Sequence, residues 1–231
     1  MSGVPGLWMI QNDLLAQSAK ILKTLNDLGY DCLAEDDFDN IPEKVFGFGK
    51  PFQSPPFDNL RNDFTRGQAF WAFLMKDGER VGGLAAQCQD LRGEPLDRFL
   101  IRTARGQYGG GQRAIEWVAP SVAQMIQGKV IYVGELFVSE HARGSRRVLT
   151  AYARLSLILM KMTWPDLDWI YAFVPREQAR FADYYAFTYR LPQAVKWSDP
   201  EPRGRASDHF LVAIPARDFE HVLACGELSK F

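Results

Sequence analysis

The sequence predicts an α/β protein with a central mixed β-sheet flanked by helices. Residues 129–138 (KVIYVGELFV) and 168–174 are apolar runs rich in β-branched and aromatic residues, which is typical of buried strands. The apolar stretch 148–162 between them has the length of a helix, and Pro165 ends it. Strand, helix and strand form a βαβ unit, which pairs its two strands in parallel.

A hairpin upstream of this unit supplies antiparallel strands to the same sheet. Residues 70–75 and 80–89 read as strands, and the segment 76–79 (Lys-Asp-Gly-Glu) between them carries an Asp-Gly turn signal. Gly82 and Gly83 in the second strand indicate a bulge or a close approach of another backbone.

The N-terminal part begins with a helix and continues into an irregular segment. Asn12 or Asp13 can cap a helix that ends before Gly29. Residues 30–68 contain many glycines and prolines and are expected to form a long loop or an excursion facing the substrate. Its phenylalanines either anchor this segment to the core or form an aromatic wall over a cleft.

The positions of prolines and glycines predict where the remaining elements begin and end. A short helix is expected at 95–105, a mobile loop at 106–111, and a second helix at 113–127. Pro175 opens a helix that runs to about Arg190. Two last strands are expected, at 193–197 and 209–214.

The composition favours an ordinary globular protein of a reducing compartment. The 231 residues can bury a sizeable core, and a net charge of -1 gives no global basic field toward nucleic acid or acidic membranes. Cys32, Cys88 and Cys225 form no CxxC pattern, so we expect neither disulfides nor a metal site. The chain starts without a secretion-signal pattern and has no apolar run long enough to cross a bilayer, so a cytoplasmic location is expected.

Three short motifs and the order of the elements point to a known family. Residues 135–138 (Glu-Leu-Phe-Val), 143–147 (Arg-Gly-Ser-Arg-Arg) and 184–189 (Tyr-Tyr-Ala-Phe-Thr-Tyr) follow one another along the chain. They resemble the Glu-Leu-x-Val strand, the RGxGxG loop and the Tyr-x-x-x-Gly-Phe helix end of the GNAT superfamily of acyl-CoA-dependent N-acyltransferases. The loop here lacks the later glycines, and a threonine replaces the glycine of the third motif.

This resemblance implies a GNAT-like fold for the whole chain. It covers residues 129–190 well and 68–90 plausibly. We expect a single GNAT-like domain over residues 1–231, with family-atypical segments at about 30–67 and 91–127. These two segments are expected to shape the acceptor site, because loops carry specificity on a shared scaffold.

The resemblance also implies acetyl-CoA or another acyl-CoA as co-substrate. A loop that feeds a helix N-terminus is suited to a pyrophosphate, because backbone N–H groups and the helix dipole converge there. Arginines at a helix N-terminus are unfavourable next to the positive end of the helix dipole, and a bound anion would offset that cost. The alternative is that these arginines belong to a solvated loop. The backbone of Phe137 and Val138 is expected to contact the pantetheine. The pyrophosphate candidates are Arg143, Gly144, Ser145, Arg146 and Arg147.

Two side chains are the catalytic candidates. Glu135 near the end of its strand can act as general base toward the amine, directly or through water, if partial burial raises its pKa. The alternative is a structural carboxylate paired with an arginine. Tyr184 is the candidate acid toward the leaving thiolate, and Tyr185 is expected to point elsewhere on the helix. The alternative for each tyrosine is a core aromatic residue.

The leading hypothesis is therefore an acyltransferase that moves an acetyl or other acyl group from CoA to a small-molecule or peptide amine by direct attack. A homodimer is compatible with it, and neither nucleic acid nor membrane is an expected partner. A second hypothesis is a non-catalytic binding module of the same fold. A third is a donor carried by acyl carrier protein or aminoacyl-tRNA, which would dock on a patch formed by Arg102, Arg105, Arg113, Arg143, Arg146 and Arg147.

Overall fold

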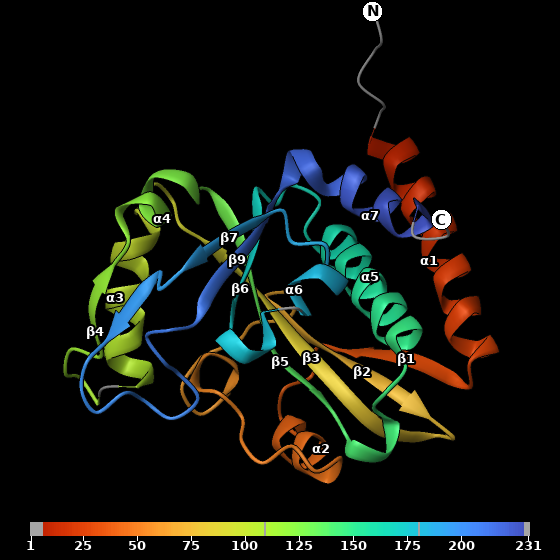
Figure 1. The fold of residues 1–231 in the computed structure, drawn as a ribbon, viewed down its shortest axis with the longest axis horizontal. Helices are drawn as coiled ribbons and strands as arrows, with labels where there is room; N and C mark the ends of the chain where they lie inside the picture. The colour runs from red at the N-terminus through yellow and green to blue at the C-terminus, as the bar shows by residue number, and fades with distance from the viewer. Residues whose placement is uncertain (1–6, 109, 180, 229–231) are drawn as a thin grey trace, which may run out of the picture.

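A seven-stranded sheet organises the computed structural model, which describes residues 7–108, 110–179 and 181–228 (Figure 1). Its strand order is β1-β2-β3-β5-β6-β9-β7, and only β5 and β6 run parallel. The strands are β1 (Tyr30–Glu35), β2 (Ala69–Lys76), β3 (Glu79–Asp90), β5 (Lys129–Val138), β6 (Trp169–Val174), β7 (Tyr189–Pro192) and β9 (Phe210–Pro215). A separate two-stranded sheet pairs β4 (Ile115–Val118) with β8 (Val195–Trp197). The predicted mixed sheet is confirmed.

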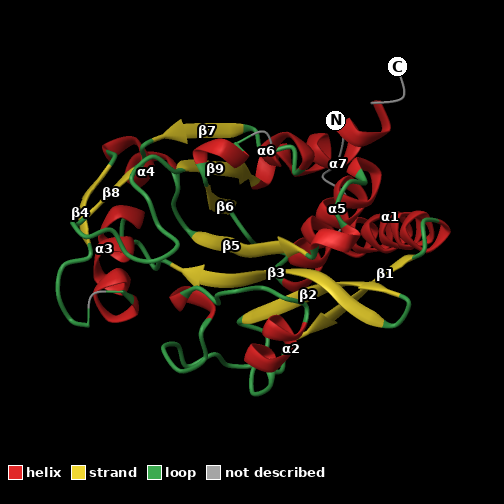
Figure 2. Ribbon diagram, turned by 60° about the horizontal axis from the view of Figure 1, so that its bottom comes forward, coloured by secondary structure: helices red, strands yellow, loops and turns green. Residues whose placement is uncertain are grey.

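Helices cover both faces of the large sheet, as Figures 1 and 2 show. On one face lie α1 (Leu7–Asp27), α5 (Arg146–Thr163) and α7 (Phe219–Leu228). The other face packs against α2 (Ile41–Gly47), α3 (Leu96–Gln107) and α4 (Pro120–Met125). A single turn, α6 (Phe181–Tyr184), and the 3₁₀ turns η1 (Pro55–Phe57), η2 (Glu140–Ala142), η3 (Arg176–Gln178) and η4 (Ala216–Asp218) complete the described elements.

The apolar runs of the central strands follow from this two-sided burial. In β2, Phe70 and Leu74 belong to the core under α1 and α5, whereas Trp71 and Phe73 belong to the core on the opposite face. Successive side chains of a strand point to opposite faces, so a strand buried on both sides needs an unbroken apolar sequence.

The parallel strands β5 and β6 part before their carboxyl ends. They pair from Val130 with Trp169 to Val133 with Ala172. Beyond Gly134, β5 continues beside β3 while β6 continues beside β9. The groups of residues 135–138 that face β6 are therefore left without a strand partner, at the edge where open α/β sheets bind their ligands.

A β-bulge accompanies this parting. Gly83 pairs with Phe137 and Ala85 with Gly134, so two residues of β5 lie opposite Leu84 alone. One of them, Glu135, has a φ of 66°, in the left-handed region that costs a non-glycine residue energy. Bulges of this kind re-aim side chains next to functional sites.

Three sequence predictions of local structure were wrong. Residues 30–68 include the edge strand β1 and helix α2. The apolar residues of these elements, such as Leu33 and Ile41, are few and stand among acidic residues, glycines and prolines, so the sequence shows no clear periodic pattern. Residues 113–127 form β4 followed by α4 instead of one helix, with Pro120 at the first position of α4. Pro175 opens only short turns, and the chain returns to the sheet as β7 within the stretch expected to be helical.

The hairpin and the helices at 95–105 and 148–162 are confirmed. Asp77 and Gly78 both have positive φ, as a two-residue hairpin turn requires. The first helix begins at Leu7, earlier than the cap expected at Asn12 or Asp13, and Gly29 with a φ of 79° follows its end. Helix α7 was not anticipated.

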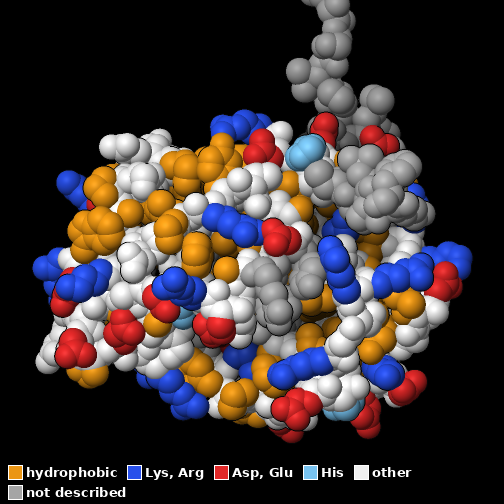
Figure 3. Space-filling view, viewed as in Figure 1, with side chains coloured by type: hydrophobic (Ala, Val, Ile, Leu, Met, Phe, Trp, Pro, Cys, Tyr) orange, Lys and Arg blue, Asp and Glu red, His pale blue; other side chains and the backbone are white. Residues whose placement is uncertain are grey.

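The surface carries mixed charge on the face shown in Figure 3, with basic and acidic side chains interspersed and apolar side chains gathered at the left over α4 and β4. Within the described part of the chain, none of the helices combines the length and the apolar character needed to cross a bilayer.

The close approach predicted at Gly82 gives a direct test of the bulge. A Cβ on Gly82 would lie 2.7 Å from the Phe137 carbonyl oxygen, whereas a Cβ on Gly83 would meet nothing closer than 3.3 Å. We expect Gly82→Ala to lower the free energy of unfolding by about 1–3 kcal/mol and Gly83→Ala to lower it less, as measured by urea denaturation. Equal effects of the two substitutions would contradict the packing described for β3 and β5.

Candidate functional site

Two cavities meet where β5 parts from β6. One is a groove of about 470 Å³ along the end of β5 and the start of α5, and it is called the donor groove here. The other, of about 250 Å³, lies toward β6 and β9 and is called the acceptor cavity. Leu136 and Gln178 border both. A molecule in the groove can therefore meet a second molecule in the cavity at this boundary.

Most of the predicted pyrophosphate and pantetheine residues line the donor groove. They are Phe137, Val138, Arg143, Gly144, Ser145 and Arg146. Arg147 is exposed and does not belong to the lining. The Ser145 hydroxyl caps α5 by accepting a hydrogen bond from the Val148 N–H at 3.2 Å. The N–H groups that precede this one in the first turn of a helix have no carbonyl partner within the helix, so they are suited to an anion.

Arg143 is exposed, and its side chain contacts the end of β5. Its Nε donates to the Val138 carbonyl at 2.6 Å, and its guanidinium lies 5.3 Å from the centre of the Phe137 ring. This arginine therefore forms one wall of the groove and occupies the Val138 carbonyl. Side-chain contacts from Arg143 and Arg146 can replace part of the close backbone approach that the missing glycines would permit.

Glu135 lies in the acceptor cavity and is held by two groups from the chain segment before η1. Its Oε1 accepts a hydrogen bond from the Ser54 N–H at 3.0 Å, and its Oε2 lies 2.8 Å from the Lys50 ammonium. The two side chains of this ion pair are only 4% and 10% exposed, for Glu135 and Lys50 respectively. The structural alternative raised from the sequence had an arginine as partner, and a lysine fills that role.

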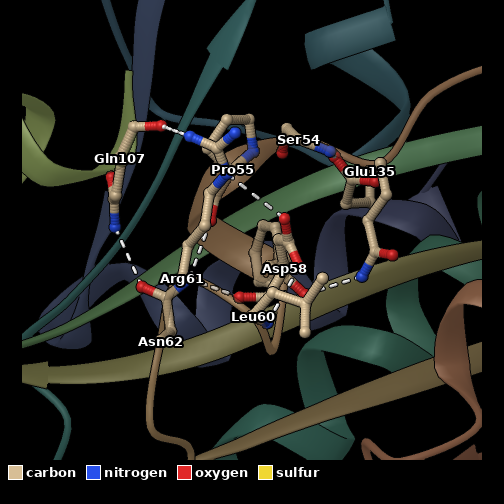
Figure 4. A network of polar contacts seen from close by, with 10 residues as sticks. Ser54, Pro55, Asp58, Leu60, Arg61, Asn62, Gln107 and Glu135 are labelled. Carbon is tan, nitrogen blue, oxygen red and sulfur yellow. Dashed lines mark hydrogen bonds and ion pairs between the residues drawn. The ribbon is translucent and has the colours of Figure 1, made fainter. Parts of the chain in front are cut away.

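Residues of the segments 30–67 and 91–127 hold this arrangement together (Figure 4). The Asn62 amide donates to the Pro55 carbonyl at 2.7 Å and accepts from Gln107 of α3 at 3.1 Å. Arg61 in turn donates to the Gln107 carbonyl at 2.6 Å. The residues that position Glu135 are thus braced by a helix from the other atypical segment.

Tyr185 reaches the acceptor cavity, whose lining also includes Tyr132. Its hydroxyl is buried without a hydrogen-bond partner, and burial holds the pKa of this phenol well above its usual range. Tyr184 belongs to α6, but its side chain lies outside the described residues. The sequence predicts that Tyr185 points elsewhere on a helix; the helix ends one residue earlier, and Tyr185 both packs in the core, as the alternative reading had it, and lines the cavity.

Three further ionisable residues of the cavity escaped the sequence prediction. Lys50 comes from the segment 48–54, and Arg205 and His209 come from the loop between β8 and β9. Burial, and next the charge of Arg205, hold the pKa of His209 below its usual range, so its imidazole is neutral near pH 7. No local motif marks these residues; the only sequence signal was a polar loop rich in proline, glutamate and arginine.

Other sequence candidates do not join the site. Helix α3, which carries Arg102 and Arg105, lies on the left in Figures 1 and 2, and α5, which begins at Arg146, lies right of centre, so the six arginines considered as a docking patch are spread over separate parts of the molecule. Burial raises the pKa of the Cys32 thiol to about 12 and that of Cys88 to about 11, which leaves neither as a thiolate near neutral pH. Cys225 has no described side chain. The described residues contain no cluster of three or more His, Cys, Asp and Glu side chains suited to a metal ion.

Comparisons with known proteins find similar folds only. No family model matches the sequence, and no curated protein matches it. An acyl-CoA N-acyltransferase from Pseudomonas aeruginosa has a TM-score of 0.46 at 11% identity over 80% of this chain and 98% of its own. Arabidopsis thaliana NAA60 in complex with acetyl-CoA has a TM-score of 0.47 at 15% identity over 81% and 99%. An agmatine N-acetyltransferase mutant has a TM-score of 0.45 at 12% identity over 80% and 100%. Because these scores lie below 0.5, the function is derived from the geometry of the site.

Proposed function

We propose that this protein is a GNAT-type acyltransferase that moves an acyl group from acyl-CoA to an amine. The observation that carries the proposal is the meeting of the donor groove and the acceptor cavity at Leu136 and Gln178. One side offers a helix N-terminus and unpaired strand edge, and the other offers ionisable groups. A bisubstrate reaction needs this juxtaposition, because holding two reactants together removes much of the entropic barrier.

In this proposal the donor lies along the groove. The pyrophosphate binds at the start of α5, near Gly144, Ser145 and Arg146, where the dipole favours negative charge. The pantetheine follows the edge of β5 at Phe137 and Val138, whose β6 side has no strand partner. The thioester then lies beside Leu136, at the boundary with the acceptor cavity.

Transfer requires three proton movements around one bond exchange. The ammonium form of the acceptor first loses a proton, and the neutral amine nitrogen then attacks the thioester carbonyl carbon. The C–S bond breaks, the nitrogen loses a second proton as the amide forms, and the CoA thiolate gains one, so that one proton is released overall. We assign the proton for the thiolate to Tyr185, whose buried hydroxyl has no hydrogen-bond partner among the described residues.

Two groups are suited to removing the proton of the amine. Glu135 is the carboxylate of the acceptor cavity, although Ser54 and Lys50 contact both of its oxygens. His209 is neutral near pH 7, and its buried Nδ1 has no hydrogen-bond partner. A water molecule can relay the proton to either group. The variants Glu135→Gln and His209→Asn therefore identify the base, since replacement of the base lowers the rate of transfer.

Binding of the donor is the first test. We expect calorimetric titration with acetyl-CoA and with CoA to show saturable binding of one ligand per chain. Arg146→Ala is expected to weaken the binding about tenfold, because it removes a charged phosphate contact. Arg147→Ala removes the same charge one residue further on, outside the groove, and is expected to change the affinity at most about twofold. A folded protein that binds neither ligand would contradict the proposal and favour a non-catalytic module.

The role of Tyr185 is tested by the rate of CoA release with a panel of amines. We expect Tyr185→Phe to lower kcat about 10²-fold with little change in KM for acetyl-CoA, as for loss of a general acid. Tyr184→Phe serves as the matched comparison, since it removes the same hydroxyl from the neighbouring residue. Loss of activity with Tyr184→Phe and none with Tyr185→Phe would restore the assignment made from the sequence.

A further inference from the structure

Arg205 is a partly buried cation on the wall that the acceptor cavity shares with a smaller cavity of about 30 Å³. It belongs to the loop between β8 and β9. Its Nε donates to the Tyr108 hydroxyl and its Nη2 to the Tyr132 hydroxyl, each at 2.7 Å. Its guanidinium also lies 5.5–5.9 Å from the ring centres of four aromatic residues. They are Tyr108, Tyr132, Phe173 and Trp197.

No acidic side chain that the structure describes neutralises this cation. Among these side chains, none with a carboxylate forms an ion pair with Arg205 within 4.0 Å. Glu135, the carboxylate of the same cavity, is paired with Lys50. His209 adds no second positive charge, because its pKa is lowered and the neutral imidazole predominates. The cavity therefore carries one uncompensated positive charge.

A purely structural role accounts poorly for this arrangement. Aromatic faces and phenol oxygens offset part of the desolvation of a guanidinium, but they supply no negative charge. A large apolar side chain would pack against the same aromatic rings without the cost of desolvating a charge. A guanidinium has five N–H donors, and the two tyrosines take one from Nε and one from Nη2. The donors that remain are suited to the two oxygens of a carboxylate.

We propose that Arg205 binds a carboxylate of the acceptor, so that the substrate is an amine that also bears an acid group, such as an amino acid. This inference rests on the proposed function. The cavity, at about 250 Å³, is small compared with the roughly 300–1,000 Å³ of sites for drug-sized ligands, which suits a molecule of amino-acid size. Its positive charge disfavours a polyamine, which would bring further cations. Phe52 and Phe187 offer apolar walls to a side chain.

The test compares reaction products that differ only in the carboxylate. The probes are N-acetylglycine, N-acetyl-leucine and N-acetyl-phenylalanine, each paired with the amide that lacks the carboxylate: N-methylacetamide, N-isopentylacetamide and N-phenethylacetamide. Calorimetry is done on the full chain, with and without saturating CoA. We expect at least one acid to bind about tenfold more tightly than its neutral counterpart. Equal affinities within every pair, or no binding by any of the acids, would overturn the proposal.

Variants separate recognition from folding. We expect Arg205→Met to abolish the preference for the acid and Arg205→Lys, which keeps the charge without the fork, to retain part of it. Arg203→Met removes an arginine of the same loop whose guanidinium lies over Phe52 on the exposed side, and it should leave the preference in place. If Arg205→Met fails to fold, the Arg205→Lys result decides, because an unchanged preference there would exclude bidentate recognition.

Acetyl-CoA binding, measured on the same samples, distinguishes this inference from the proposed function. Binding of acetyl-CoA without a preference for acids would overturn the inference and leave the acyltransferase in place. A preference for acids without acetyl-CoA binding would support Arg205 as a carboxylate site and remove the acyltransferase.

Discussion

The parting of β5 from β6 at Gly134 is the constraint on which the rest of the site depends. Parallel pairing stops at Val133, and the bulge opposite Leu84 turns Glu135 into a left-handed conformation. Such a conformation costs of order 1–3 kcal/mol and persists only where surrounding packing imposes it. The close contact of Gly82 with the Phe137 carbonyl is part of that packing. The strain yields an unpaired strand edge and a carboxylate aimed into a cavity.

The described side chains of the acceptor cavity include one ion pair and one cation without an acidic partner. The buried pair of Glu135 and Lys50 neutralises both charges, and the removal of either would leave a buried charge alone. The segment that carries Lys50 is braced by α3 through Asn62 and Gln107, so the segments 30–67 and 91–127 both stabilise one side of the site. Arg205 is the cation without an acidic partner, and we propose that a ligand supplies its anion.

The sequence predicted the central strands and the donor side because these depend on local patterns. Apolar runs define β5 and β6, and Arg143 and Gly144 lie in the loop before α5 as expected. The acceptor side could not be predicted in the same way, because Lys50, Tyr185 and Arg205 are brought together from three distant segments. Tyr185 lines the cavity although the sequence places it elsewhere on a helix, because α6 is a single turn that ends before it.

A crystal structure of the protein with bound CoA tests the central claim most directly, because the claim concerns where two cavities meet. We predict that the pyrophosphate lies at the N-terminus of α5 and the pantetheine along residues 136–138. The sulfur should then lie beside Leu136, within hydrogen-bond reach of the Tyr185 hydroxyl or one water away from it. CoA bound elsewhere, or a sulfur directed away from the acceptor cavity, would contradict the account.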